Sequence, residues 1–183
     1  MAKKDFYSIV QVANLRPQKD HFTSLKAMKY LIDKGYNIHI DYIGDISLDQ
    51  NYTKQILEFA KKHKLEKHTS FHGKQSNISS FLANANLGIL SSLSEGLPLS
   101  LLEYALAKIP VVVTDVGQCR DVIGKHGIIV EPKNPEKLAL GIEKYINNNS
   151  LSVMHSKYFY EKVKNKFNPE KVIKKMIDIY SNV

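Results

Sequence analysis

The sequence predicts an α/β fold in which a doubly wound parallel sheet of about six strands is followed by two extra C-terminal helices. Three observations support this class. Short apolar segments alternate along the chain with longer segments in which apolar residues recur at helical spacing. Several short segments are apolar at consecutive positions, as strands buried on both faces are. Turn-forming residues separate the segments. Such repeated units are typical of a parallel sheet covered by helices on both faces.

The predicted strands are short and end at turn residues. Residues 38–43 alternate between apolar and polar side chains, and Gly44 breaks the pattern. Residues 110–114 form the clearest buried strand, because its valines and threonine are β-branched. In chain order, the predicted strands span residues 7–12, 38–43, 69–71, 87–90, 110–114 and 127–130.

The predicted helices each have an apolar face. In residues 23–34, for example, Leu25, Met28 and Leu31 recur at helical spacing. The asparagine-rich residues 147–150 indicate a helix stop and the only internal boundary that the sequence suggests. In chain order, the predicted helices span residues 23–34, 52–63, 77–83, a segment beginning near Pro98, and residues 117–122, 135–147, 151–165 and 169–180.

The composition indicates one globular domain. The 183 residues are 43% apolar and 24% charged, so we treat residues 1–183 as a single domain with a helical extension over 151–183. The single cysteine, Cys119, excludes an internal disulfide and suits a reducing, cytoplasmic compartment. No apolar stretch approaches the roughly 20 residues that a membrane span requires.

The formal net charge of +8 favours anionic ligands, nucleic acid or an anionic membrane face. Most of the lysines are spread along the chain as expected for a solvated surface. Their denser spacing after residue 150 predicts weak peripheral contact with acidic lipids at the inner face of the membrane. Nucleic acid is not an expected partner, because the sequence lacks an aromatic platform interleaved with basic residues.

Two carboxylates, Glu95 and Glu103, stand eight positions apart around a glycine, a proline and an apolar run. Pro98 suits the first turn of a helix, where its missing N–H costs nothing, so we predict a loop at Gly96 and Leu97 before it. Glu103 then lies in the second turn and leans back toward the helix mouth. That mouth offers free N–H groups and a positive dipole end to an anion. The arrangement suits a nucleotide diphosphate sugar, which has a phosphate centre and hydroxyl-rich ends.

The carboxyl ends of parallel strands are where such a sheet binds ligands. The loops expected at that edge are 14–19, 44–45, 72–73, 91–97 and 114–118. The candidate side chains therefore converge on one rim.

Four segments in this order carry a resemblance to a known family: 12–20, 91–103, 110–118 and 127–132. Together they resemble the C-terminal, nucleotide-sugar-binding half of the group 1 (family 4) retaining glycosyltransferases with the GT-B architecture. The resemblance extends from about Ser8 to Tyr180 and implies a Rossmann-like domain.

The resemblance also implies roles for individual residues. Glu95 would contact hydroxyls of the donor sugar, and Glu103 would bind the ribose. Lys19 would bind the donor diphosphate together with an arginine five positions earlier, but Asn14 stands there, and Arg16 is the nearest arginine. The candidate catalytic residues are Lys19, Arg16 and Glu95. The candidate nucleotide-sugar-binding residues are Asn14, Gly44, His72, Gly73, Glu95, Gly96, Leu97, Pro98, Leu99, Ser100 and Glu103.

The implied activity is hexosyl transfer from a UDP-, GDP- or ADP-sugar to a glycan or lipid-linked acceptor during polysaccharide biosynthesis. Members of this family need no metal ion, and we expect neither a metal nor a cofactor. They place the reaction between two domains, and we expect this chain to lack the N-terminal acceptor-binding half, either because it is an excised domain or because a partner supplies that half. We therefore expect the isolated domain to be inactive alone.

A different class of function remains open: a non-catalytic α/β module that binds a nucleotide or docks another protein. A receiver-like module would need aspartates clustered at strand ends, which Asp41, Asp45 and Asp115 do not provide.

Overall fold

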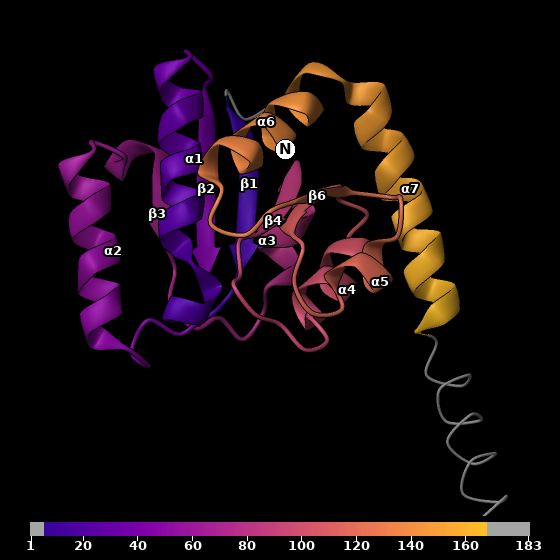
Figure 1. Cartoon of the computed structure of the whole chain (residues 1–183), viewed down its shortest axis with the longest axis horizontal. Helices are drawn as coiled ribbons and strands as arrows, with labels where there is room; N and C mark the ends of the chain where they lie inside the picture. The colour runs from indigo at the N-terminus through magenta and orange to yellow at the C-terminus, as the bar shows by residue number, and fades with distance from the viewer. Residues whose placement is uncertain (1–5, 168–183) are drawn as a thin grey trace, which may run out of the picture.

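Six parallel strands form the centre of the structure, a computed structural model that describes residues 6–167 (Figure 1). The sheet order is β3-β2-β1-β4-β5-β6, and every neighbouring pair is parallel. The strands are β1 (Tyr7–Val12), β2 (Ile38–Ile43), β3 (Thr69–Phe71), β4 (Leu87–Leu90), β5 (Val111–Thr114) and β6 (Ile128–Val130). The predicted doubly wound sheet is confirmed. The first four strands have the predicted bounds, and the other two begin one residue later than expected.

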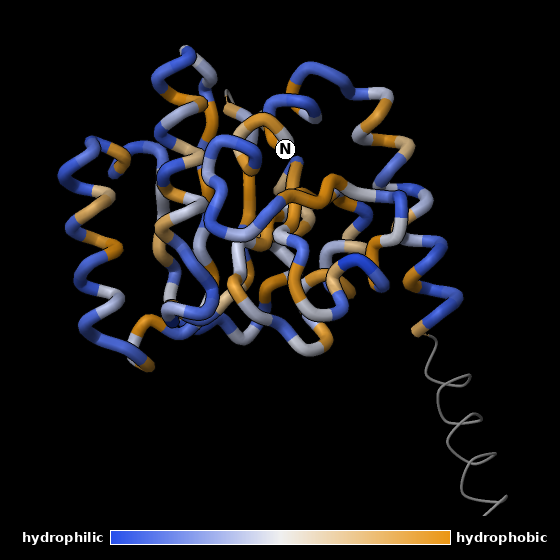
Figure 2. Tube along the Cα trace, viewed as in Figure 1, coloured by the Kyte–Doolittle hydropathy of each residue, from blue (hydrophilic) through white to orange (hydrophobic). Residues whose placement is uncertain are grey.

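Helices cover both faces of the sheet. The α-helices are α1 (His21–Asp33), α2 (Gln50–Lys62), α3 (Ser79–Ala83), α4 (Leu99–Leu106), α5 (Cys119–Ile123), α6 (Pro135–Asn147) and α7 (Asn149–Lys166). Two short 3-10 helices are η1 (Pro17–Lys19) and η2 (Glu66–His68). One core cluster joins the strands to α1, α2 and α6, and a second joins them to α3, α4, α5 and α7. In Figure 2 the strands are accordingly the most hydrophobic part of the trace.

Helix starts differ from the predictions because polar caps precede the apolar faces. The carboxylate of Asp20 accepts a hydrogen bond from the Thr23 N–H, so α1 begins two residues earlier than expected. Asp49 caps α2 in the same way. Asn148 caps α7 directly after α6 ends, which confirms the helix stop expected there. The helix predicted over 169–180 lies outside the described residues.

The prediction that Pro98 lies in the first turn of α4 is wrong by one position. Pro98 has an extended ψ of 98° and is the N-cap residue, so the helix begins at Leu99. The ring still fixes φ at −76°, which directs the chain from the loop into the helix.

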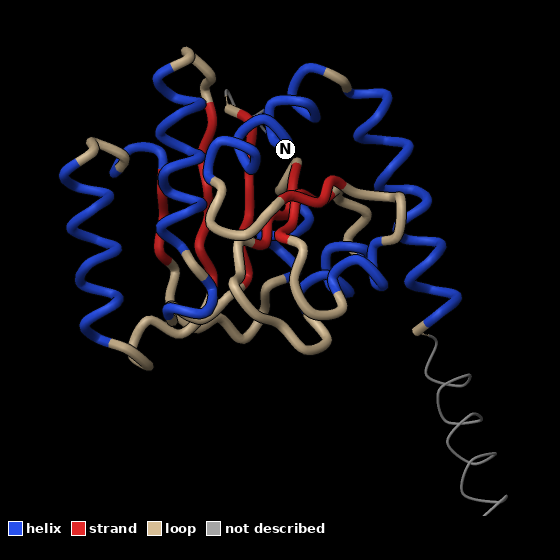
Figure 3. The backbone as a smooth tube through the Cα atoms, in the orientation of Figure 1, coloured by secondary structure: helices blue, strands red, loops and turns tan. Residues whose placement is uncertain are grey.

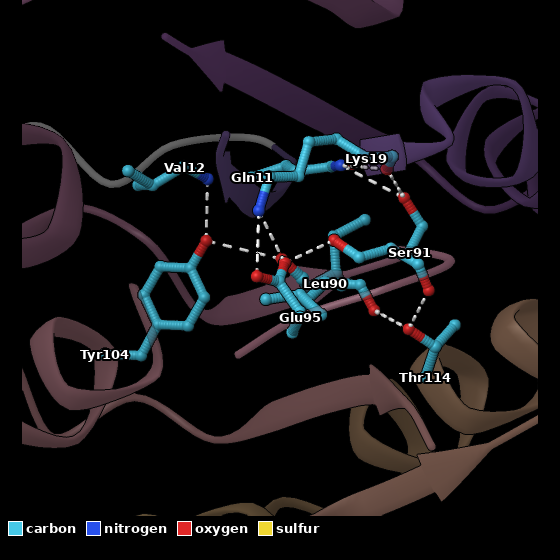
Figure 4. Close-up of polar contacts among 10 residues, drawn as sticks. Gln11, Val12, Lys19, Leu90, Ser91, Glu95, Tyr104 and Thr114 are labelled. Atoms are coloured by element: carbon cyan, nitrogen blue, oxygen red, sulfur yellow. Dashed lines mark hydrogen bonds and ion pairs between the residues drawn. The ribbon is translucent and has the colours of Figure 1, made fainter. Parts of the chain in front are cut away.

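A buried tyrosine fixes α4 on the sheet. The Tyr104 hydroxyl accepts a hydrogen bond from the Val12 N–H at 2.7 Å and donates one to the Ile89 carbonyl at 3.3 Å (Figure 4). Its ring packs over Gly88, where an added Cβ would lie 2.6 Å from a ring carbon. The helix that carries Glu103 is thereby held against β1 and β4.

The loops that follow the strands gather along one edge of the sheet, the lower edge in Figure 3. This is the carboxyl edge, where parallel α/β sheets bind ligands. None of the helices within residues 6–167 combines the length and the apolar character that a bilayer crossing requires.

Candidate functional site

Lys19 and Glu95 form an ion pair at the carboxyl edge of the sheet. The Lys19 Nζ lies 2.7 Å from Oε1 and 2.8 Å from Oε2 of Glu95. The Glu95 side chain is 8% exposed and the Lys19 side chain 28%, so the contact is partly shielded from water. Two residues to which the resemblance assigns different parts of one ligand are therefore in direct contact.

Two buried hydroxyls hold the Glu95 loop in place. The Ser92 hydroxyl donates to Glu95 Oε1 at 2.6 Å, and the Thr114 hydroxyl donates to the Ser92 carbonyl at 2.6 Å. Both side chains are fully buried. The backbone of Gly117 crosses the same loop, and an added Cβ would lie 1.9 Å from the Glu95 carbonyl oxygen. The direction of the Glu95 carboxylate is thus set by β4, β5 and the loop after β5.

The Lys19 segment is bound to the same loop by a second set of contacts, drawn in Figure 4. The Gln11 amide donates to the Ser91 hydroxyl at 3.0 Å, and that hydroxyl donates to the Lys19 carbonyl at 2.9 Å. The Leu93 N–H donates to the Gln18 carbonyl at 2.7 Å. These hydrogen bonds join the turn after β1 to the loop after β4 and keep Lys19 beside Glu95.

Asn14 and Arg16 lie on the exposed side of this turn. The Asn14 side-chain oxygen accepts a hydrogen bond from the Asp45 N–H at 2.8 Å. Hydrogen bonds from Ser47, with smaller effects from Lys74 and Arg16, lower the pKa of Asp45. The described contacts do not bring Arg16 to the Lys19–Glu95 pair.

Glycines bring the neighbouring loops together. At Gly44 an added Cβ would lie 2.2 Å from the Ala13 carbonyl oxygen, so a side chain cannot be accommodated. The Gly44 N–H donates to the Gly73 carbonyl at 3.1 Å. His72 lies beside them, with Nε2 2.7 Å from a carboxylate oxygen of Asp41. The His72 side chain is therefore engaged with β2. The His72 N–H donates to the Tyr42 carbonyl, and the Gln75 amide donates to the His72 carbonyl.

Glu103 lines a groove of about 440 Å³ between α3 and α4. Its other lining residues are mostly apolar: Ile78, Ser79, Leu82, Ala83, Leu106 and Ala107. Burial raises the pKa of the Glu103 carboxyl. From the sequence, we predicted that the Glu103 side chain leans toward the mouth of α4. In the structure, Glu103 lies on the wall of this groove.

The α4 mouth itself is open to a ligand. Within the described chain no side chain caps this helix, so its first N–H groups face outward. Pro98 is buried beneath the turn, while Gly96 and Ser100 lie on its surface. Leu97 and Leu99 are exposed apolar side chains beside it. A phosphate group would find both N–H donors and a favourable dipole here.

Residues 6–167 offer little support for a metal site or for a cysteine nucleophile. No group of three His, Cys, Asp or Glu residues is placed to hold a metal ion. Burial raises the pKa of the Cys119 thiol to about 11, so this residue is protonated at neutral pH and is not a nucleophile.

Sequence reasoning from single residues missed Ser92 and Thr114. Ser92 could have been found from its position. It lies three residues before Glu95, just after an apolar strand, and a buried hydroxyl there needs a hydrogen-bond partner.

Known proteins resemble this chain in both sequence and structure. Capsular polysaccharide biosynthesis glycosyltransferase CapM of Staphylococcus aureus is 25% identical over 182 residues, which cover 97% of this chain and 46% of CapM. The chain spans less than half the length of the curated relatives that it matches.

Solved structures share the fold. Anabaena Alr3699/HepE in complex with UDP-glucose superposes with a TM-score of 0.91 at 17% identity, over 98% of this chain and 50% of that one. The C-terminal domain of a glycosyl transferase group 1 family protein (LpcC) from Francisella tularensis gives 0.80 at 23% identity, over 89% of this chain and 87% of that one.

The family model of the glycosyl transferases group 1 matches residues 2–166, which include all six strands and the Lys19–Glu95 pair. By this match, the chain belongs to the glycosyl transferases group 1 family.

Proposed function

We propose that this chain is the donor-substrate domain of a retaining GT-B glycosyltransferase and binds a nucleotide diphosphate hexose. The observation that carries the proposal is the Lys19–Glu95 pair beside the uncapped mouth of α4. A cation and an N–H-lined helix end suit a diphosphate, and a carboxylate next to them suits sugar hydroxyls. The UDP-glucose complex of HepE supports a uridine nucleotide among the candidate donors.

Donor binding would replace the ion pair with two new sets of contacts. The diphosphate oxygens take the Lys19 ammonium and the α4 N–H groups, and Glu95 turns its oxygens to hydroxyls of the sugar. As the glycosidic bond breaks, negative charge grows on the departing diphosphate. Lys19 stabilises that charge from a position fixed in advance, an effect typically worth ~3 kcal/mol. Arg16 adds a second positive charge at longer range, and Asn14 provides an amide that can bond to phosphate.

The nucleoside end would occupy the groove between α3 and α4. Its volume of about 440 Å³ lies in the range of small-molecule sites. Glu103 accepts hydrogen bonds from the ribose hydroxyls, and the apolar wall packs against the ring system. In the loop at His72 and Gly73, the Gly73 N–H donates to the edge of the base.

The reaction would take place in the cytoplasm, between this domain and an N-terminal acceptor-binding domain of the same parent chain. Lys19 and the α4 dipole supply the positive charge that the leaving group requires, so the proposed mechanism is metal-independent. The acceptor is a glycan or a lipid-linked saccharide of a polysaccharide pathway, in keeping with the name of CapM. The isolated domain would bind the donor without completing the transfer.

Calorimetric titration of the isolated domain with UDP, GDP, ADP and UDP-glucose tests the proposal. We expect at least one of these compounds to bind with a dissociation constant in the millimolar range or below. The variant Lys19→Gln should bind the same compound more weakly. Lys54→Gln is the matched control, because this lysine is exposed on α2 and pairs only at the surface with Glu58. Absence of binding by all four compounds to a folded domain would overturn the proposal.

A further inference from the structure

A second cavity lies away from the candidate donor site. It has a volume of about 490 Å³ and is lined by Lys125, His126, Met154, His155 and Tyr158. Lys125 and His126 precede β6, so the cavity lies toward the amino edge of the sheet, whereas the donor site lies at the carboxyl edge. The other wall is α7, which flanks the sheet in Figure 1. Nothing in the proposed transfer reaction uses these residues.

Positive groups surround this cavity. Two lysines act on its histidines from neighbouring elements: Lys162 on His126, and Lys144 on His155. The Lys162 ammonium also donates to the Asp121 carbonyl at 2.8 Å, which places it at the C-terminal end of α5. The Asp121 carboxylate is the acidic group that acts on Lys162. The lining residues themselves include cations and neutral groups but no carboxylate.

The walls of the cavity are held in place by ring and hydrogen-bond contacts. The His126 ring stacks on Tyr158 at a centroid distance of 5.4 Å and an interplanar angle of 26°. The His155 Nδ1 lies 2.7 Å from the hydroxyl of Tyr145, a buried residue of α6. Because one nitrogen of His155 is engaged in this way, its other nitrogen remains available to a ligand.

We propose that this cavity binds a small phosphate-bearing molecule at a site separate from the donor site. Lys125, His126 and His155 donate hydrogen bonds to the phosphate oxygens, and Tyr158 and Met154 pack against the organic part. Charge-assisted bonds of this kind are the strong ones in proteins, and the volume suits a metabolite the size of a sugar phosphate.

Protonation of the histidines would be coupled to binding. Burial and the neighbouring cations lower the pKa of His126 and of His155, so both rings lose their proton more readily than an ordinary histidine. The groups facing them are Lys125, Lys144, Lys162, Tyr145 and Tyr158. A bound phosphate favours the protonated rings, so binding should raise the pKa of both histidines.

Imidazole NMR spectra of the whole chain, titrated with inorganic phosphate and with glucose 6-phosphate, test the proposal. We expect saturable shifts of the His126 and His155 signals and a higher pKa of both rings when phosphate is bound. The double variant Lys125→Gln, His126→Gln should bind about tenfold more weakly, as expected for the loss of charged donors. The matched control is Lys62→Gln, His63→Gln, a lysine–histidine pair at the C-terminal end of α2.

Three outcomes would overturn the proposal. The first is the absence of saturable shifts at His126 and His155 in the folded protein. The second is an equal effect of the control variant, which would indicate unspecific attraction to net charge. The third is a response confined to vesicles of phosphatidylglycerol, which would assign the residues to a lipid surface. The assigned His126 and His155 signals, resolved from those of the other five histidines, report on this cavity and not on binding at Lys19.

Discussion

The ammonium of Lys19 meets both carboxylate oxygens of Glu95 across 76 positions of sequence. Lys19 belongs to the turn after β1, and Glu95 belongs to the loop after β4, which is the neighbouring strand in the sheet. The strand order β2-β1-β4 therefore brings the two charges together. This relationship gives rise to predictions on the donor site and on the framework that holds it.

Replacement of Ser92 by alanine should impair recognition of the sugar and leave recognition of the nucleotide intact. The hydroxyl that holds Glu95 Oε1 is lost, and a hydrogen bond to a charged group is worth about 1.5–3 kcal/mol. We expect the affinity for the nucleotide sugar to fall while that for the free nucleotide diphosphate changes little. Ser94→Ala, an exposed serine of the same loop, is the control. An equal loss for both ligands would show that Ser92 merely supports the loop.

Replacement of Glu103 by alanine should weaken the binding of the nucleotide diphosphate and the binding of the nucleotide sugar by the same factor. A carboxylate that accepts bonds from the ribose contributes about 1–3 kcal/mol, and both ligands contain that ribose. Calorimetry measures both affinities, and Glu58→Ala on the exposed face of α2 is the control. Unchanged affinities would remove Glu103 from the ribose site.

Removal of the Tyr104 hydroxyl should lower the free energy of unfolding. In Tyr104→Phe the Val12 N–H loses its partner inside the protein, which costs about 1–3 kcal/mol. Urea denaturation followed by circular dichroism gives the value. Tyr30→Phe, on the half-buried part of α1, is the control and should change little. Equal midpoints for Tyr104→Phe and the wild type would contradict the anchoring role.

Stability should fall as the pH decreases from about 6.5 toward 3, because of His21. This imidazole is fully buried, and burial lowers its pKa from 6.5 to about 3. Between these values the unfolded chain binds a proton that the folded protein does not, so acid favours unfolding. The unfolding free energy should change by roughly 1.4 kcal/mol per pH unit because of His21, over the range in which the histidine is protonated in the unfolded chain and neutral in the folded protein.

The variant His21→Leu isolates this contribution. Its unfolding free energy, measured with urea between pH 4 and 7, should depend on pH less steeply than that of the wild type. His63→Leu, at the C-terminal end of α2, serves as the control for the loss of a histidine. Parallel pH profiles for the wild type and His21→Leu would refute the role of His21.

The sequence was sufficient to predict the sheet because its strands are either apolar runs or alternating segments. Gly44 follows β2, and polar residues follow β3, β4, β5 and β6. Helix starts were less predictable, since the caps at Asp20 and Asp49 precede the apolar faces that define the periodicity. The resemblance placed Lys19 and Glu95 on one rim. It did not predict their direct contact, which depends on strand order and on the hydroxyl contacts of Ser91 and Ser92.

The second cavity could not be predicted from local patterns. His126 and His155 belong to elements that are far apart in sequence, and each histidine alone resembles an ordinary surface residue. Only the packing of α7 beside the turn before β6 places them together.

At the proposed donor site, the Lys19–Glu95 ion pair would favour ligands that compensate both of its charges. Free phosphate would have to draw Lys19 away from its acid and strand a half-buried carboxylate, and a free sugar would strand the ammonium in the same way. Leaving one member of a shielded pair alone is strongly unfavourable. An intact donor compensates both charges at once, so cellular phosphate and hexoses would compete poorly with it for this rim.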